Sequence, residues 1–245
     1  MQSTPTQRQQ ELLKGTTTIG LVCKDGVVLA TEKRATAGNL IANKATQKLF
    51  KIDQNIGMTV AGLVGDAQTL ARYLKAEVSL YRLRRSAPLS AEGAATLLAN
   101  ILNGNRMFPY YAWLILGGVD AKGGHVFSVD PAGGSIEDRY VSVGSGSTFA
   151  YGTLEEAYSR DLSVSDGVDV AIRGLTVAMK RDSASGDGYT VHTITAREYR
   201  EFSEEEINKR LKALKLPIPP TPASASAGCP SSPASARCSA WSRRW

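Results

Sequence analysis

The sequence has little cysteine and little histidine, with three Cys and two His among 245 residues. Cys23, Cys229 and Cys238 do not have the spacing of a metal-ligand set, and Cys23 alternates inward on an expected strand as a small apolar residue does. This usage indicates a reducing compartment. It predicts neither a metal site nor a cofactor.

Long apolar runs are absent as well. No stretch is long enough to cross a bilayer as a helix, and residues 1–15 lack the apolar centre of a secretory signal. We therefore expect a soluble, cytoplasmic protein with no membrane partner.

Positive charge is in excess, but it is concentrated at the ends of the chain. Of the net charge of +6, residues 217–245 contribute +3 and residues 1–15 contribute +1, so residues 16–216 carry only +2. This body has no cluster of Lys and Arg interleaved with aromatic residues. The distribution argues against nucleic-acid binding.

The apolar pattern predicts blocks of strands and blocks of helices. Two-residue periods predict a hairpin over residues 18–31 and further strands over residues 57–64, 112–117, 125–130, 139–143 and 189–194. Helical periods follow Asp66, Ser90, Ser163 and Ser203, which we expect to cap the helices, and one more follows residue 147. No regular strand-helix-strand alternation requires a parallel sheet. We therefore expect an α+β fold, a four-layer αββα sandwich of two antiparallel sheets flanked by helices.

The composition divides the chain into three segments. Residues 1–15 are a polar leader, and residues 16–216 have the patterning of one domain. In residues 217–245, Pro, Ser and Ala occupy 19 of 29 positions and no apolar period survives. We expect this tail to be disordered.

The first strand begins at a Gly-Thr bond. Glycine leaves its own carbonyl open, so the hydroxyl of Thr16 can approach the Gly15 carbonyl as an N-to-O acyl shift requires. Cleavage would free the α-amine of Thr16, whose reference pKa of about 7.7 to 8.0 lets it take the hydroxyl proton near neutrality. Residues 1–15 would then be a propeptide removed by self-cleavage at the processing site, Gly15-Thr16. The alternative is that this segment is only a strand start with high β-propensity.

An amine-activated threonine also needs a nearby cation and a carboxylate that orients it. Glu32 ends the strand paired with the Thr16 strand, and Lys48 follows sixteen residues later at the start of another expected short strand. If both lie beside Thr16, the two form an ion pair whose ammonium faces the hydroxyl. Most Glu and Lys pairs are solvated instead, so the pattern leaves both interpretations open.

Six segments together resemble the β subunits of the 20S proteasome, N-terminal-nucleophile hydrolases, and specifically their archaeal catalytic type. The resemblance covers about residues 15–214. It is carried, in the family's order and spacing, by Gly15-Thr16-Thr17-Thr18, Ala30-Thr31-Glu32-Lys33-Arg34, Lys48-Leu49-Phe50, Ala61-Gly62-Leu63-Val64-Gly65-Asp66, Gly144-Ser145-Gly146-Ser147 and Arg181-Asp182-Ser183-Ala184-Ser185-Gly186.

The resemblance implies a role for each matching residue. Thr16 would be the nucleophile, Lys48 would tune it and Glu32 would hold Lys48, although many relatives carry Asp at the position of Glu32. Ser145, Asp182 and Ser185 match positions that hydrogen-bond the threonine amine and the nucleophilic water. Taken singly, both serines are typical turn residues. The N–H of Gly62 matches the oxyanion donor.

The resemblance also implies an apolar substrate pocket. The matching positions are Ala35, Thr46, Val60 and Val64, with Thr36 and Gly62 offering backbone contacts to an extended peptide. An acidic or basic side chain would lose hydration there without gaining a partner, so we expect cleavage after large apolar residues.

The assembly that the resemblance implies is a threonine endopeptidase (EC 3.4.25.1) within stacked seven-membered rings. Its partners would be proteasome α subunits, other β subunits, an ATP-dependent unfoldase and polypeptide substrates. A simpler ring peptidase or an amidase of the same superfamily is one alternative, and a non-catalytic structural β subunit is another. A nucleic-acid or membrane binder driven by the tail is the most distant.

Overall fold

A computed structural model describes residues 15–219. Apart from Gly15, the expected propeptide lies outside the described residues, as does the expected tail after Pro219. No helix within residues 15–219 is long and apolar enough to span a bilayer.

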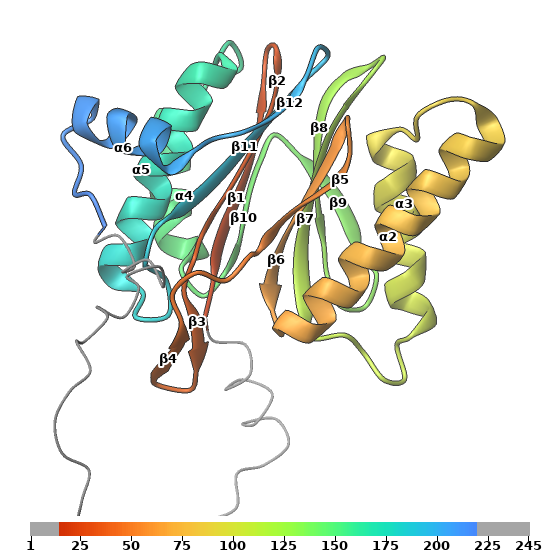
Figure 1. The fold of residues 1–245 in the computed structure, drawn as a ribbon, viewed down its shortest axis with the longest axis horizontal. Helices are drawn as coiled ribbons and strands as arrows, with labels where there is room; N and C mark the ends of the chain where they lie inside the picture. The colour runs from red at the N-terminus through yellow and green to blue at the C-terminus, as the bar shows by residue number, and fades with distance from the viewer. Residues whose placement is uncertain (1–14, 220–245) are drawn as a thin grey trace, which may run out of the picture.

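Two five-stranded antiparallel sheets pack face to face at the centre of the molecule (Figure 1). The first sheet has the strand order β10-β1-β2-β11-β12. Its strands are β1 (Thr17–Cys23), β2 (Gly26–Glu32), β10 (Tyr140–Gly144), β11 (Tyr189–Thr195) and β12 (Tyr199–Glu201). The second has the order β5-β6-β7-β8-β9, formed by β5 (Leu49–Asp53), β6 (Ile56–Gly62), β7 (Ala112–Asp120), β8 (Gly123–Val129) and β9 (Ser135–Asp138).

Helices cover the outer face of each sheet (Figure 1). The first sheet is covered by α4 (Ser147–Ala157), α5 (Val164–Arg181) and α6 (Glu204–Ala213), and the second by α2 (Val64–Arg85) and α3 (Ala91–Gly104). A two-stranded ribbon, β3 (Ala35–Ala37) and β4 (Leu40–Asn43), extends beyond the sheets. The arrangement confirms the αββα sandwich.

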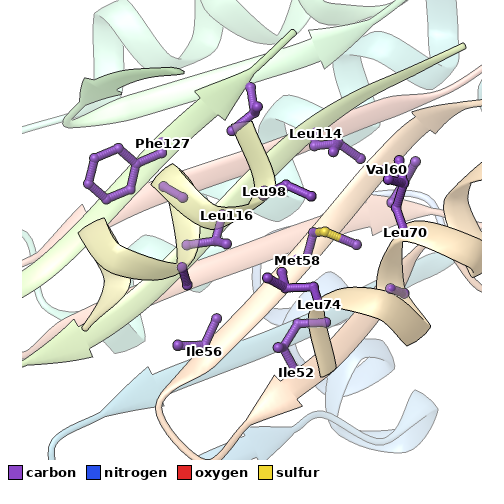
Figure 2. Packing of buried hydrophobic residues seen from close by; sticks show 14 of the residues in the cluster. Ile52, Ile56, Met58, Val60, Leu70, Leu74, Leu98, Leu114, Leu116 and Phe127 are labelled. Carbon is purple, nitrogen blue, oxygen red and sulfur yellow. The ribbon is translucent and has the colours of Figure 1, made fainter. Parts of the chain in front are cut away.

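Apolar side chains fill the three interfaces between these four layers. The cluster under α2 and α3 includes Ile56, Met58, Leu70 and Leu98, all fully buried (Figure 2). A second cluster lies under α4, α5 and α6, and a third lies between the sheets. Burial of each such aliphatic side chain contributes about 1.5–3 kcal/mol to the stability of the fold. The strands whose ends form the site are therefore anchored in a close-packed core.

Strand register brings the ends of four strands of the first sheet together. In the β1–β2 hairpin Thr18 pairs with Thr31, so β1 begins where β2 ends. β11 pairs with the other side of β2 with Tyr189 opposite Glu32, and β10 places Gly144 opposite Thr17. The start of β1, the end of β2, the end of β10 and the start of β11 thus lie at one end of the sheet.

Three of the expected helix caps are confirmed, and one is wrong. The hydroxyls of Ser90, Ser163 and Ser203 each accept a backbone N–H at the start of a helix. Asp66 does not cap α2, because that helix starts two residues earlier with Leu63 at its N-cap. The Asp66 carboxylate instead accepts the Tyr111 N–H at 2.8 Å, which links α2 to the residue just before β7.

The short strands β3, β4, β9 and β12 were not expected from the sequence. They have three or four residues each and are largely exposed. Such segments have no buried face, so the two-residue alternation that reveals a half-buried strand is missing.

Candidate active site

The Gly15–Thr16 bond lies at the start of β1, in a conformation that requires glycine. Gly15 has φ +128°, and a Cβ built there would lie 2.3 Å from the Thr36 hydroxyl oxygen. The Thr16 hydroxyl donates a hydrogen bond to the Gly15 carbonyl oxygen. Thr16 is 3% exposed, so this contact is shielded from water. The nucleophile predicted from the sequence thus lies against the carbonyl that it would attack.

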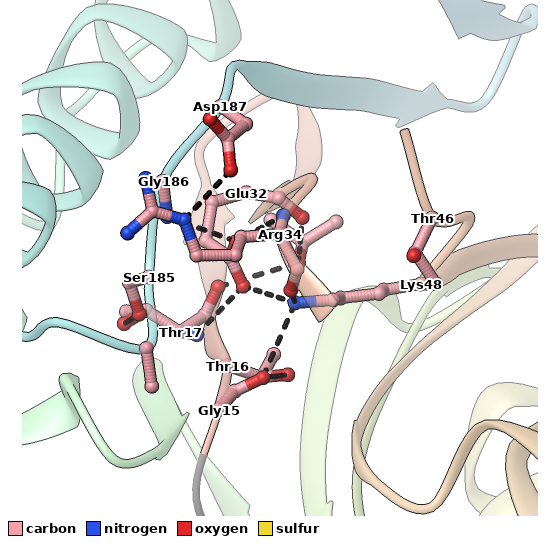
Figure 3. Close-up of polar contacts among 12 residues, drawn as sticks. Gly15, Thr16, Thr17, Glu32, Arg34, Thr46, Lys48, Ser185, Gly186 and Asp187 are labelled. Atoms are coloured by element: carbon pink, nitrogen blue, oxygen red, sulfur yellow. Dashed lines mark hydrogen bonds and ion pairs between the residues drawn. The ribbon is translucent and has the colours of Figure 1, made fainter. Parts of the chain in front are cut away.

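Lys48 points at the same carbonyl (Figure 3). Its ammonium donates to the Gly15 carbonyl oxygen at 3.3 Å, forms an ion pair with Glu32 and donates to the Arg34 carbonyl oxygen. An ammonium has three hydrogens, and each has an oxygen partner here. The ion pair predicted from the sequence is therefore present, buried and directed at the scissile bond.

Glu32 is held by the backbone as well as by Lys48. Its carboxylate accepts the N–H groups of Arg34 at 2.6 Å, Gly186 at 3.1 Å and Thr17 at 3.3 Å. The residue is completely buried. Burial raises the pKa of Glu32, and the charge of Lys48 and the backbone donors oppose that rise.

Burial also sets the acidity of Lys48. It lowers the pKa of the Lys48 ammonium, and the Glu32 charge acts in the opposite direction. A lysine with a lowered pKa gives up a proton more readily than an exposed one. Lys48 can therefore act as a cation and as a proton carrier within contact distance of the Gly15 carbonyl.

A second polar cluster surrounds the Thr16 nitrogen. Asp182 accepts the hydroxyl hydrogens of Ser145 at 2.6 Å and Ser185 at 2.7 Å through the same carboxylate oxygen. The Thr16 N–H donates to the Ser145 hydroxyl at 3.4 Å. The structure thus brings together the three residues proposed for the amine side of the nucleophile, although Ser145 and Asp182 lie 37 positions apart.

Sequence reasoning missed Arg34 and Asp187. The Arg34 guanidinium donates to the Asp187 carboxylate at 2.7 Å and to the Ser183 carbonyl oxygen at 2.8 Å, which ties the end of β2 to the loop before β11. A Cβ on Gly186 would lie 2.5 Å from this guanidinium, so glycine makes room for it. Arg34 was within a segment that carried the resemblance, but nothing in its local pattern named its partner.

A cavity of about 230 Å³ opens beside Thr16. Five of the predicted substrate residues line it, namely Ala35, Thr36, Val60, Gly62 and Val64. Leu63 and Ala67 add further apolar surface, and Lys48 is the only charged residue of the lining within the part of the chain that the structure describes. Thr46 does not line it, and its hydroxyl donates to the Asn43 side chain at 3.1 Å.

A larger cavity, of about 690 Å³, is lined by turn residues such as Asn55, Leu89, Lys122 and Arg197. It contains none of the clustered residues described above, so size alone does not mark the site. A nucleophile, a buried ion pair and hydroxyl acceptors converge on the smaller cavity, which is therefore favoured as the active site.

Known proteins resemble this chain over most of its length. Residues 12–194 match the family model of proteasome subunits. The chain is 57% identical over 203 residues to a proteasome subunit beta of Methanothermobacter thermautotrophicus. This match covers 82% of the chain and 97% of the relative. It is 53% identical over 206 residues to the proteasome subunit beta of Ferroglobus placidus, covering 84% of this chain and 98% of that protein. A similar protein of Archaeoglobus profundus is 51% identical over 208 residues, 84% of this chain and 97% of its own length. The chain therefore belongs to the proteasome subunit family.

Proposed function

We propose that this chain is a catalytic β subunit of a proteasome core, a threonine endopeptidase whose nucleophile is Thr16. The observation that carries the proposal is the placement of the Thr16 hydroxyl and the Lys48 ammonium on one carbonyl, that of Gly15. The similar proteins bear the name proteasome subunit beta, which supports the same conclusion. As a member of this family, the chain assembles into the proteasome core with other subunits.

Self-cleavage is the first step of the proposed mechanism. The Thr16 oxygen attacks the Gly15 carbonyl carbon as its proton leaves for the Thr16 nitrogen, and Lys48 stabilises the negative charge that develops on the carbonyl oxygen. The Gly15–Thr16 C–N bond then breaks as the nitrogen takes that proton, which leaves an ester on the threonine oxygen. Water hydrolyses the ester, so residues 1–15 depart with a carboxylate and Thr16 retains a free amine.

Peptide hydrolysis reuses the same groups. The freed amine of Thr16 takes the hydroxyl proton, and the oxygen attacks the substrate carbonyl to form an acyl-enzyme that water later hydrolyses. The positive charge of Lys48 lowers the free energy of forming the Thr16 alkoxide, and Glu32 holds Lys48 in place. Ser145, with its hydrogen engaged by Asp182, presents an acceptor to the amine.

The cavity beside Thr16 suits a large apolar side chain before the scissile bond. Val60, Val64, Ala35 and Ala67 line it, and the Lys48 charge is already paired with Glu32. A charged substrate side chain would be desolvated there without a partner. Cleavage after apolar residues is therefore favoured.

Proteasome α subunits, stacked heptameric rings and an ATP-dependent unfoldase complete the proposal. A non-catalytic structural subunit is the alternative. The buried ion pair argues against it, because two desolvated charges are costly and contribute little to stability compared with apolar side chains of similar size. A chemical role accounts for keeping both.

The test is the N-terminus and activity of the purified, assembled particle. We expect wild-type chains to begin at Thr16 and to hydrolyse fluorogenic peptides. Thr16→Ala should assemble, keep residues 1–15 and hydrolyse nothing, whereas Thr16→Ser should retain processing and a reduced rate. An active particle that keeps residues 1–15 would overturn the proposal.

A further inference from the structure

Thr17 contacts both hydrogen-bond networks of the site. Its backbone N–H donates to the Glu32 carboxylate at 3.3 Å, and its hydroxyl lies 2.7 Å from the hydroxyl of Ser185 (Figure 3). Thr17 is completely buried, so water does not compete for these contacts. Neither the motif nor the chemistry discussed above uses this hydroxyl.

Counting hydrogens sets the direction of the contact. A hydroxyl has one hydrogen, and Ser185 gives its hydrogen to Asp182 at 2.7 Å. In the contact with Thr17, Ser185 is therefore the acceptor and Thr17 the donor. Ser145 gives its hydrogen to the same Asp182 oxygen at 2.6 Å, which leaves its lone pairs for the nitrogen of Thr16. The donations run from Thr17 through Ser185 to Asp182, and from Thr16 through Ser145 to Asp182.

The surrounding backbone limits where the Thr17 oxygen can be. A Cβ on Gly146 would lie 2.1 Å from this oxygen and 3.1 Å from the Asp182 carboxylate. A β-branched side chain also has few χ1 rotamers. The hydroxyl is therefore held between Gly146 and Ser185, and its hydrogen has a fixed target.

We propose that Thr17 is a positioning residue, whose hydroxyl orients Ser185 on Asp182 and thereby keeps the acceptor face of Ser145 toward the amine of Thr16. This inference rests on the proposed function and extends it to a residue outside the predicted set. Thr17 does not line the substrate cavity. Its loss should therefore lower kcat and leave KM nearly unchanged.

The experiment compares variants of the full chain in assembled particles. Thr17→Val keeps the shape and removes the donor, Thr17→Ala removes the oxygen without adding a methyl near Ser185, and Thr17→Ser keeps the hydroxyl. Thr18→Val is the matched control, because Thr18 is the next residue of β1, equally buried, and its hydroxyl oxygen has no hydrogen-bond partner among residues 15–219. The readouts are kcat, KM and the processed fraction.

We expect kcat to fall about five- to tenfold in Thr17→Val and Thr17→Ala, the size of one lost buried hydrogen bond. Thr17→Ser should stay within about twofold of wild type, as should Thr18→Val. On a Ser185→Ala background, Thr17→Ala should cost little more, because its effect passes through Ser185. Assembled Thr17→Ala with wild-type kcat, or full additivity with Ser185→Ala, would overturn the inference.

The outcome separates this inference from the proposed function. A wild-type particle that neither starts at Thr16 nor hydrolyses peptides would remove the proposed function. An active wild type with an equally active Thr17→Ala variant would remove only the role of Thr17. If Thr17→Val does not assemble, Thr17→Ala supplies the decisive comparison.

Discussion

At the scale of single residues, the proposed self-cleavage depends on Gly15 and Lys48 as much as on Thr16. Gly15 adopts a positive φ that strains any other residue, and it thereby turns its carbonyl toward both the hydroxyl and the ammonium. Lys48 is shared by three oxygens, so moving it disturbs the whole site.

Gly15→Ala should slow self-cleavage. The new methyl would lie 2.3 Å from the Thr36 hydroxyl oxygen at a φ of +128°, which strains the scissile segment by about 1–3 kcal/mol. Intact mass over time reports the processed fraction. Gly123→Ala is the matched control, because Gly123 has φ +123° and no atom within 4 Å of the added methyl. Equal processing of the two variants would contradict the role given to Gly15.

Lys48→Ala should abolish both processing and turnover. The change removes the cation from the Gly15 carbonyl and leaves the buried Glu32 without its ion-pair partner. Loss of a positioned proton carrier typically costs about 10²–10⁴-fold in rate. Lys48→Arg should fail too, because a planar guanidinium does not release a proton.

Lys51→Ala is the control for Lys48, since Lys51 lies three residues further along the chain, in β5, where its ammonium lies over the Tyr199 ring and forms no ion pair within residues 15–219. Peptide hydrolysis and the processed fraction are measured in assembled particles. Wild-type rates in Lys48→Ala would leave the amine of Thr16 as the only base.

At the scale of elements, the site depends on how the loop of residues 182–187 is held against the end of β2. The Arg34–Asp187 ion pair makes that link, and Asp187 has a positive φ of 64°. The same loop supplies Asp182 and Ser185, and its Gly186 N–H reaches Glu32. A shift of this loop therefore moves both networks.

Asp187→Asn should lower turnover more than it lowers stability. Asn tolerates the left-handed conformation, so the backbone at residue 187 stays unstrained, but the loop loses the ion pair that fixes it against the end of β2. A partly exposed pair contributes up to about 1 kcal/mol to stability, but sub-ångström shifts of Asp182 affect rate strongly. Hydrolysis rate and melting temperature are compared, with Glu92→Gln at the exposed Lys122–Glu92 pair as the control. A rate equal to wild type would show that the Arg34–Asp187 pair does not position the loop for catalysis.

At the scale of the whole molecule, several large apolar side chains are left in solvent. Leu40, Leu83, Met107, Phe108 and Ile136 are each at least 67% exposed. Exposed apolar groups of this kind are typical of surfaces that become buried between proteins. A chain that assembles with other subunits has such surfaces.

Stability should fall as the pH drops from about 6.5 to about 4, in part because of His192. This side chain is buried against Tyr199, and burial lowers the pKa of His192 to about 4 from 6.5. Between these values the unfolded chain binds a proton that the folded chain does not, so unfolding becomes easier by about 3 kcal/mol in total. Denaturation of wild type and His192→Asn between pH 7 and pH 4 checks this. Equal pH dependence in both would contradict it.

Removal of residues 217–245 should leave peptide hydrolysis essentially unchanged. The tail lacks any apolar period, and the last helix of the domain, α6, ends at Ala213. The truncated chain would also lose three Arg and no acid, which halves the net charge of +6. A truncated subunit that assembles and does not cleave would show that the tail takes part in activity.

The sequence by itself determined the local features of this protein. Periodicity predicted the β1–β2 hairpin, and residues adjacent in the chain predicted the serine caps and the open approach to the Gly15 carbonyl. Asp66 shows the limit, because the local sequence predicted that it caps α2, whereas its carboxylate accepts the N–H of Tyr111, 45 residues away. The exposed strands lacked a pattern to detect.

Tertiary structure alone decided which of these residues meet. Ser145 reaches Thr16 from 129 positions away, and Gly186 reaches Glu32 from 154 positions away. Resemblance named most of these residues, but the contacts of Arg34 with Asp187 and of Thr17 with Ser185 appeared only in the folded chain. The physical reason is that periodicity records which face of an element is buried, whereas strand register and loop closure choose the partner across it.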